Sequence, residues 1–186
     1  MVPPAQRPPL EPSLTAAELV DGAWREKPAP DRNHANAQAG ATTAVRGPFH
    51  RKSQPGGRGG WWILTEADVR LGAEIFRPDI AGWRRERVPV LPDERPLTAT
   101  PDWICEVISS SNRAHDTVLK QRRYHQAGVP WYWLLDPEAG TLIVLKHEPQ
   151  GYLELLVAER HEVVRPEPFA AVQVRVGLLL GDDPEE

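Results

Sequence analysis

Two carboxylates and a lysine stand on three separate predicted elements of this 186-residue chain. Asp79 comes at the end of one apolar segment, Glu106 lies inside the apolar run of residues 103–108, and Lys120 lies on the predicted helix that follows. A charged side chain inside an apolar strand is costly to bury unless it is paired or binds a cation. Mg²⁺ binds one or two protein carboxylates and leaves positions for phosphate oxygens, while a nearby lysine offsets charge in the transition state. The trio is therefore typical of metal-assisted phosphodiester hydrolysis, with Asp79 and Glu106 as the metal ligands.

Some of these residues also have plainer interpretations. Asp116 and Lys120 are an acid and a base four residues apart on the predicted helix, and such a pair on a solvated face contributes only about 0.2–0.5 kcal/mol. Taken alone, Lys120 fits that interpretation better. Asp102 is interpreted as a turn residue before the strand, and Cys105, which should point away from Glu106, as a core residue.

The first elements that must position the site can be predicted from propensity and turn signals. Residues 15–20 have helical character, which would place Glu18 on a short helix. Residues 31–45 predict an alanine-rich helix with Asp31 as its N-cap, and residues 47–60 a Gly- and Pro-rich loop. His34 on that helix is a candidate for phosphate contact or proton transfer, whereas a hydrogen-bonded structural histidine is the commoner role.

The strands follow from runs of β-branched and aromatic residues. Strands are predicted over 61–64 and over 73–76, the second running into Asp79 and continuing as 80–83. The strand 103–108, the helix 114–127 and the strand 131–135 form a unit in which the two strands should be parallel neighbours. Residues 141–146 and 152–158 alternate as a hairpin, while residues 171–180 fit a strand or a short helix.

Length and composition favour one domain over residues 13–180, between a disordered Pro-rich tail at 1–12 and an acidic tail at 181–186. No apolar stretch is long enough to cross a bilayer, and the first ten residues lack the apolar core of a secretory signal. A cytoplasmic protein that does not reside in a membrane is therefore expected. A single cysteine excludes an intrachain disulfide framework and a cysteine-rich zinc site.

The net charge of -4 argues against a protein that coats nucleic acid without sequence preference. Arginines and lysines do cluster over residues 46–58 and 84–87, where solvated loop surface is the commoner role and contact with a nucleic-acid backbone the alternative. Seven tryptophans lie mostly on predicted strands and are interpreted as core residues. Trp83, beside Arg84 and Arg85, is the best candidate for base stacking.

The order of the motifs resembles a known family, the Uma-type restriction endonucleases, bacterial members of the PD-(D/E)xK nuclease superfamily. The family pattern runs from PD through a strand-borne E-V-(L/I)-S to D and K on a helix, then Y, G-V and a strand ending in D-P. This chain carries every part of it, in Pro101-Asp102, Glu106-Val107-Ile108-Ser109, Asp116, Lys120, Tyr124, Gly128-Val129 and Asp136-Pro137. Upstream it also has Glu18-Leu-Val-Asp-Gly22, His34, Gly60-Trp-Trp-Ile-Leu64 and Arg77-Pro-Asp-Ile80, so that the resemblance covers about residues 14–180.

The resemblance implies a restriction-endonuclease-like core, an α/β fold of the α+β kind with a central mixed β-sheet flanked by helices. It further implies Asp79 and Glu106 on the metal, Lys120 completing the triad, and Glu18 binding metal-bound water or a second ion; a solvated or capping glutamate is the equal alternative for Glu18. One departure stands out, because the superfamily lysine normally follows the acidic residue by two positions and Ile108 occupies that place. In the Uma-type pattern the lysine comes from the following helix.

The function expected from these observations is endonucleolytic hydrolysis of DNA phosphodiester bonds by a metal-activated water, with Mg²⁺ or Mn²⁺ as cofactor. The alternative is a catalytically inactive nuclease-fold protein that binds nucleic acid or a protein partner, because folds are reused without their chemistry. A homodimer is one arrangement for cutting both strands of DNA, and an exposed sheet edge would provide a route to it.

Overall fold

A computed structural model describes residues 16–108 and 115–185 of the chain, with no account of the side chains of His115 and Asp116. Its centre is a six-stranded mixed sheet in the order β10-β9-β8-β7-β6-β3. All neighbouring strands are antiparallel except β7 and β8. The strands are β3 (Trp61–Thr65), β6 (Ile80–Arg84), β7 (Trp103–Val107), β8 (Trp131–Asp136), β9 (Thr141–Glu148) and β10 (Gly151–Glu159).

Two smaller sheets and three helices in the described part surround this sheet. A four-stranded sheet has the order β2-β1-β5-β4, and β11 pairs with β12 in a two-stranded one. The helices are α1 (Arg32–Phe49), α2 (His115–Gln126) and α3 (Val176–Leu179). The short strands are β1 (Ala17–Val20), β2 (Ala23–Glu26), β4 (Val69–Leu71), β5 (Glu74–Phe76), β11 (Val163–Val164) and β12 (Val174–Arg175).

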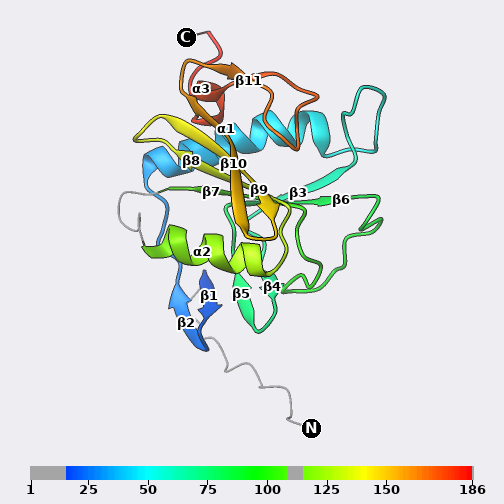
Figure 1. Cartoon of the computed structure of the whole chain (residues 1–186), viewed down its shortest axis with the longest axis vertical. Coiled ribbons are helices and arrows are strands. Elements are labelled where there is room, and N and C mark those ends of the chain that lie inside the picture. Colours follow the sequence, from blue (N-terminus) through cyan, green and yellow to red (C-terminus); the bar gives the residue numbers. More distant parts are fainter. Residues whose placement is uncertain (1–15, 109–114, 186) are drawn as a thin grey trace.

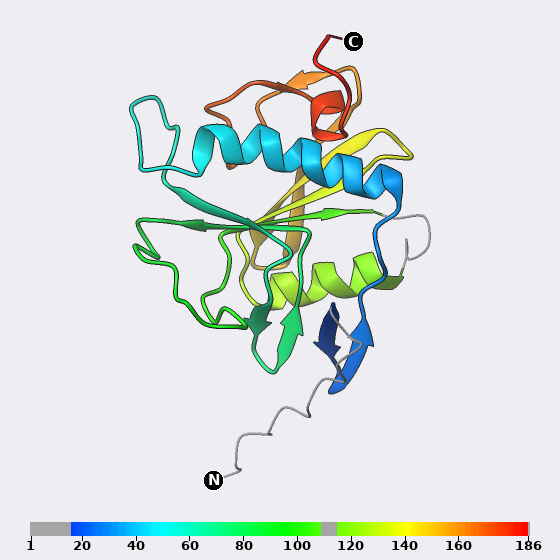
Figure 2. The same ribbon diagram turned by 180° about the vertical axis from the view of Figure 1, so that it is seen from behind.

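The molecule has three layers. Helices α1 and α3 cover one face of the six-stranded sheet, while α2 and the four-stranded sheet cover the other (Figure 1). The view from behind shows the same division, with α1 running along one face and α2 along the opposite one (Figure 2). The fold is thus a central mixed sheet flanked by helices, as expected.

Strand alternation produces two hydrophobic cores, one on each face of the sheet. In β7, Trp103, Cys105 and Val107 pack on the side of α1, while Ile104 packs on the side of α2. Glu106 alternates with Cys105 and therefore belongs to the face that α2 covers. The prediction that Cys105 is a core residue pointing away from Glu106 is confirmed, because its side chain is fully buried in the first core.

Helix α1 begins where predicted and continues beyond the predicted end. The side chain of Asp31 caps it by accepting a hydrogen bond from the backbone N–H of His34 at 2.9 Å. Small residues on one face allow close approach to the sheet, and Phe49 closes the buried stripe. The helix contains Gly47 and Pro48, which were predicted to lie in the loop, because the burial of that stripe outweighs the low helix propensity of two residues. The stripe consists of His34, Ala37, Ala41, Val45 and Phe49.

The strand–helix–strand unit predicted from the sequence is confirmed. Strands β7 and β8 are parallel neighbours, Trp103 lies opposite Trp131, and α2 connects them. The chain leaves α2 through Gly128 at a φ of 74°, a conformation that favours glycine. The predicted hairpin is present as β9 and β10, and the ambiguous segment 171–180 holds both a short strand and a one-turn helix.

One of the wrongly predicted elements carries a site residue. Residues 15–20 were expected to be helical, but the described part is strand β1, so that Glu18 lies on a strand. Pairing with β2 on one side and β5 on the other outweighs the helix propensity of this short run. The predicted strand 73–83 is likewise two strands, β5 and β6, which belong to different sheets with Asp79 just before β6.

The Pro-rich tail expected at 1–12 lies outside the described residues. Within the described part, no helix combines the length and the apolar character that crossing a bilayer requires.

Candidate active site

Buried charge is concentrated at one place in the described part of the chain. Seven polar or charged side chains there are buried, and six of them form one connected cluster. The seventh is Asp102, which accepts hydrogen bonds from the backbone N–H of Arg84 and from the side chain of Arg87. Asp102 was predicted to be a turn residue before the strand, and these contacts give it a structural role. Because burying charge is costly, such a concentration indicates a functional site. The cluster contains Glu18, His34, Arg77, Asp79, Glu106 and Lys120.

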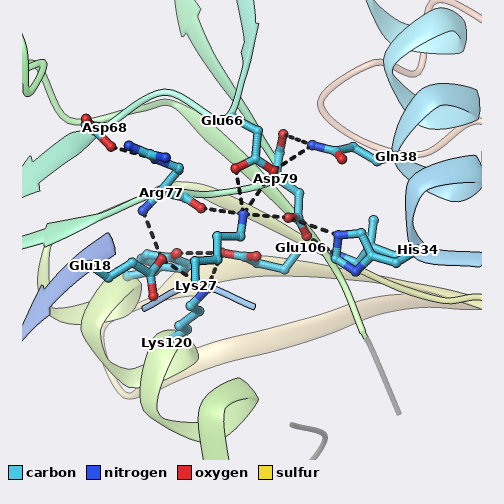
Figure 3. A network of polar contacts seen from close by, with 12 residues as sticks. Glu18, Lys27, His34, Gln38, Glu66, Asp68, Arg77, Asp79, Glu106 and Lys120 are labelled. Atoms are coloured by element: carbon cyan, nitrogen blue, oxygen red, sulfur yellow. Dashed lines mark hydrogen bonds and ion pairs between the residues drawn. The ribbon is translucent and has the colours of Figure 1, made fainter. Parts of the chain in front are cut away.

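Asp79 is the most deeply buried of the carboxylates, with no exposed surface. Its Oδ2 accepts a hydrogen bond of 2.7 Å from the backbone N–H of Val107, the residue after Glu106. Its Oδ1 lies 2.8 Å from Lys27 Nζ and 3.2 Å from His34 Nε2 (Figure 3). The hydrogen bond from Val107 couples the start of β6 to the end of β7, and this is how two residues 27 positions apart come to share one site.

Glu106 projects from β7 toward α2, and two residues of that helix reach the same oxygen. Tyr124 donates its hydroxyl proton to Glu106 Oε1 at 2.6 Å, and Lys120 Nζ lies 3.4 Å from the same atom. Lys120 and Tyr124 are one helical turn apart, so both lie on the helix face that covers β7. Tyr124 therefore orients Glu106, and its ring packs edge-on against Phe76 and Tyr132.

The plainer interpretation placed Lys120 on a solvated helix face, and the structure contradicts it. Its side chain is buried, and its Nζ lies 3.2 Å from Glu18 Oε1 as well as near Glu106. Glu18 Oε1 also accepts a hydrogen bond of 2.9 Å from the backbone N–H of Arg77. Glu18 is therefore a positioning group that holds Lys120 against Glu106, and the candidate ion pair with Asp116 lies outside the described side chains.

Lys27 is the site residue that sequence reasoning missed. Its ammonium lies 2.8–3.0 Å from four oxygens, which Glu66, Arg77 and Asp79 provide (Figure 3). Gln38 of α1 completes this side of the cluster by donating to Glu66 Oε1 and to the backbone oxygen of Asp79. Lys27 follows β2 in a stretch with no regular structure, and no local sequence signal relates it to Asp79.

The two carboxylates have opposite pKa shifts, each the balance of several causes. Burial acts to raise the pKa of Asp79, but the hydrogen bond from His34 and the charge of Lys27 outweigh it and hold that pKa well below its ordinary value. For Glu106, burial is the largest cause and raises the pKa to about 7, with the charge of Asp79 adding to it and Lys120 opposing it. Asp79 is thus the fixed anion of the site, and Glu106 is the group whose charge depends on a nearby cation.

The pKa values of Lys27 and His34 are both raised because each side chain lies beside buried carboxylates. Burial acts to lower the pKa of Lys27, but the charges of Asp79, Glu106 and Glu66 outweigh it and raise that pKa. Burial likewise acts to lower the pKa of His34, and its hydrogen bond to Asp79 more than offsets this. His34 is therefore a hydrogen-bonded partner of Asp79, the commoner of the two roles expected for it.

Two further expectations can be compared with the structure. Trp83, the candidate for base stacking, has no exposed surface, and its Nε1 donates to the backbone oxygen of Ala99, so this expectation is wrong. The neighbouring arginines stack on other rings instead, with Arg85 3.5 Å above Trp62 and Arg84 4.7 Å above Trp61.

The donor types at the site fit a hard divalent cation. Within residues 16–108 and 117–185, no three side chains of His, Cys, Asp or Glu already converge as a complete metal cage. The oxygens of Asp79, Glu66 and the Arg77 carbonyl do, however, converge on a cation, the ammonium of Lys27. Carboxylate and carbonyl oxygens are the ligands that Mg²⁺ and Mn²⁺ prefer, and Asp79 and Glu106 are the residues that would hold such an ion.

Comparisons with known proteins identify the family and the fold of the chain. The family model Uma2, described as "Putative restriction endonuclease", matches residues 5–178. A solved structure described as "a putative nuclease belonging to DUF820", from Anabaena variabilis, matches with a TM-score of 0.69 at 21% identity, covering 89% of each chain. At that identity the likeness shows the fold, and it confirms the predicted fold class. No curated protein matches the chain. Because the family model spans nearly the whole chain, the protein belongs to the Uma2 family of restriction endonuclease-like proteins.

Proposed function

We propose that the protein is a metal-dependent endonuclease that hydrolyses phosphodiester bonds of DNA. One observation carries this proposal. Asp79, Glu106 and Lys120 come from three separate elements, yet a hydrogen bond from Val107 to Asp79 and the 3.4 Å contact between Lys120 and Glu106 join them in one buried cluster. Family membership over residues 5–178 supports the same reaction class.

In this proposal Asp79 and Glu106 hold Mg²⁺ or Mn²⁺, which when bound polarises the phosphate and activates the attacking water. Asp79 is suited to this role because it stays ionised across the physiological pH range. Tyr124 and Val107 fix the orientations of the two carboxylates through their hydrogen bonds. Such preorganisation matters because a small displacement of a catalytic group can cost a large part of the rate.

Lys120 supplies positive charge where negative charge develops on the phosphate. Glu18 contacts the ammonium together with Glu106, and the backbone N–H of Arg77 fixes Glu18 in turn. This arrangement keeps Lys120 in place before substrate binds. The role proposed for Glu18 is therefore positioning of Lys120, in addition to the metal-bound water that the family resemblance implies.

Nicking of supercoiled plasmid DNA with Mg²⁺ or Mn²⁺ tests the proposal. The variants Asp79→Asn, Glu106→Gln and Lys120→Met remove one charge each while keeping the side-chain size close, and each should reduce the nicking rate by about a hundredfold or more. Lys146→Met, which removes a half-exposed lysine on β9, is the matched control purified in the same way. Nicking that persists at the wild-type rate in all three variants would contradict the assignment.

One observation favours the alternative, a catalytically inactive nuclease fold that binds nucleic acid or protein. Both oxygens of Asp79 already have partners, Lys27 and His34 on one and the N–H of Val107 on the other. A site neutralised in this way needs no metal ion. Binding of Mn²⁺ measured by calorimetry separates the two functions, because the inactive module has no reason to bind the ion and the nuclease must.

A further inference from the structure

The ammonium of Lys27 occupies a position built for a cation. Its Nζ lies 3.0 Å from both carboxylate oxygens of Glu66, 2.9 Å from the backbone oxygen of Arg77 and 2.8 Å from Asp79 Oδ1. The lysine side chain is only 13% exposed and Asp79 is 1% exposed, so water offers little screening. Four oxygen ligands around one buried positive charge resemble a coordination shell more than a surface ion pair.

Lys27 and a divalent ion would compete for the same oxygen. Asp79 Oδ1 is the oxygen that Lys27 and His34 contact, while Oδ2 accepts the hydrogen bond from the backbone N–H of Val107. An ammonium and a dication on one oxygen would stand within a few ångströms of each other, and like charges at that separation repel strongly in a buried site. Each of the two cations therefore weakens the binding of the other at Asp79 Oδ1.

Lys27 can leave without unfolding any element. Its backbone N–H donates to the carbonyl of Ala16, which fixes the main chain at the end of the β1–β2 hairpin, while its side chain has four freely rotating bonds. Glu66, its other anionic partner, is 40% exposed and lies toward the solvent. A rotation of the side chain toward solvent would release Asp79 and keep the ammonium close to Glu66.

We propose that Lys27 is a tethered cation that neutralises Asp79 in the metal-free protein and is displaced when a divalent metal ion binds. This inference rests on the proposed metal-dependent function and specifies how that site is regulated. Lys27 keeps the buried carboxylate compensated until metal arrives, and it lowers the apparent metal affinity because the ion must first replace it. Metal binding then moves one side chain from the interior to the surface.

Calorimetric titration with Mn²⁺ alone tests the competition. Lys27→Met keeps an unbranched side chain and removes the ammonium, leaving Asp79 without its nearest cation. We expect this variant to bind Mn²⁺ at least about tenfold more tightly than the wild type, since the ion then compensates a buried charge that has lost its partner. Lys52→Met removes an exposed lysine and is the matched control, with wild-type affinity expected.

Amine labelling of the wild-type protein tests the displacement without relying on a variant that folds. The chain has only four lysines, at positions 27, 52, 120 and 146, so mass spectrometry can follow each one separately after brief acetylation. We expect acetylation of Lys27 to be slow in metal-free protein and to rise severalfold at saturating Mn²⁺. Exposed Lys52 should react at the same rate in both conditions.

The outcomes separate this inference from the proposed function. Equal or weaker Mn²⁺ binding by folded Lys27→Met, or Lys27 that stays protected at saturating Mn²⁺, would overturn the displacement while leaving the metal site intact. If neither the wild type nor Lys27→Met binds Mn²⁺, both the displacement and the metal-dependent function are wrong. Tighter binding by the variant together with metal-dependent labelling of Lys27 supports both.

Discussion

Replacing Glu106 by glutamine should change how the stability of the metal-free protein depends on pH. Glu106 is 7% exposed and shares its environment with Asp79, and burial together with that negative charge raises its pKa from 4.5 to about 7. In the unfolded chain the same carboxyl group ionises near its ordinary value. Between these two pH values the folded protein therefore holds a proton that the unfolded chain has released.

The sign and size of the effect follow from this difference. Where the folded state binds more protons than the unfolded state, raising the pH favours unfolding. The difference between pKa 4.5 and about 7 corresponds to about 3 kcal/mol of stability, at about 1.4 kcal/mol for each pH unit, lost mainly as the pH rises from about 4.5 to about 7. Glutamine does not titrate, so Glu106→Gln should lack this part of the loss. The pKa of His34 is also raised, so the wild type and Glu106→Gln both lose some further stability as the pH rises.

Urea unfolding of metal-free protein at pH 5, 6, 7 and 8 measures the effect. The free energy of unfolding of the wild type should fall relative to that of Glu106→Gln by about 2–3 kcal/mol over this range. Glu154→Gln, which replaces an exposed glutamate on β10, is the matched control and should follow the wild type. Parallel curves for wild type and Glu106→Gln would refute the argument, because Glu106 would then ionise alike in both states.

Two further substitutions test how the site is supported. Tyr124→Phe removes the buried hydroxyl that donates to Glu106 Oε1 at 2.6 Å; it should cost about 1–3 kcal/mol in urea unfolding and reduce nicking, and full activity would show that Tyr124 does not orient the carboxylate. Gly82→Ala places a Cβ 3.1 Å from two core side chains beside β6; it should cost about 1–3 kcal/mol through overpacking, and an unchanged unfolding midpoint would show that the two side chains can move aside.

The part of the site that could be predicted from the sequence lies on elements with strong local signals. The apolar run around Glu106, the helix carrying Lys120 and the following strand form a unit whose connectivity alone makes β7 and β8 parallel neighbours. A helix that crosses back over its own strand brings Lys120 to the buried face of that strand. The chemical type of each side chain then indicated which buried residues belong to the site, because an ionised group such as Glu106 inside β7 needs a partner.

The parts that failed depend on long-range pairing. The segment with Glu18 has the local propensity of a helix, yet it forms a strand because it lies between β2 and β5. A run of four residues carries too little local preference to resist such pairing. Although the secondary structure of this segment was predicted wrongly, Glu18 still belongs to the site, because its side chain contacts Lys120 from β1.

Lys27 could not be predicted for a different reason. Its partners Glu66 and Asp79 lie 39 and 52 residues away, and it belongs to no helix or strand. A lysine in an irregular segment is usually solvated, and only the assembled fold brings Lys27 into contact with Asp79 and Glu66. Only the balance of charge among the predicted site residues indicated that a further cation was needed. The candidates included three carboxylates but one lysine, so the predicted site offered no cation for Asp79.

The departure from the motif that the family resemblance implies has a counterpart in α2. Ile108, which stands at the position of the lysine in that motif, is only partly buried and packs against the core on the α2 side. The helix supplies the missing charge because Lys120 and Tyr124, four residues apart, both reach Glu106 Oε1. Lys120 and Tyr124 give that oxygen a cation and a hydroxyl donor from one face of the helix. Because both residues come from α2, the same helix supplies the positive charge and orients the carboxylate, although Ile108 stands where the motif has its lysine.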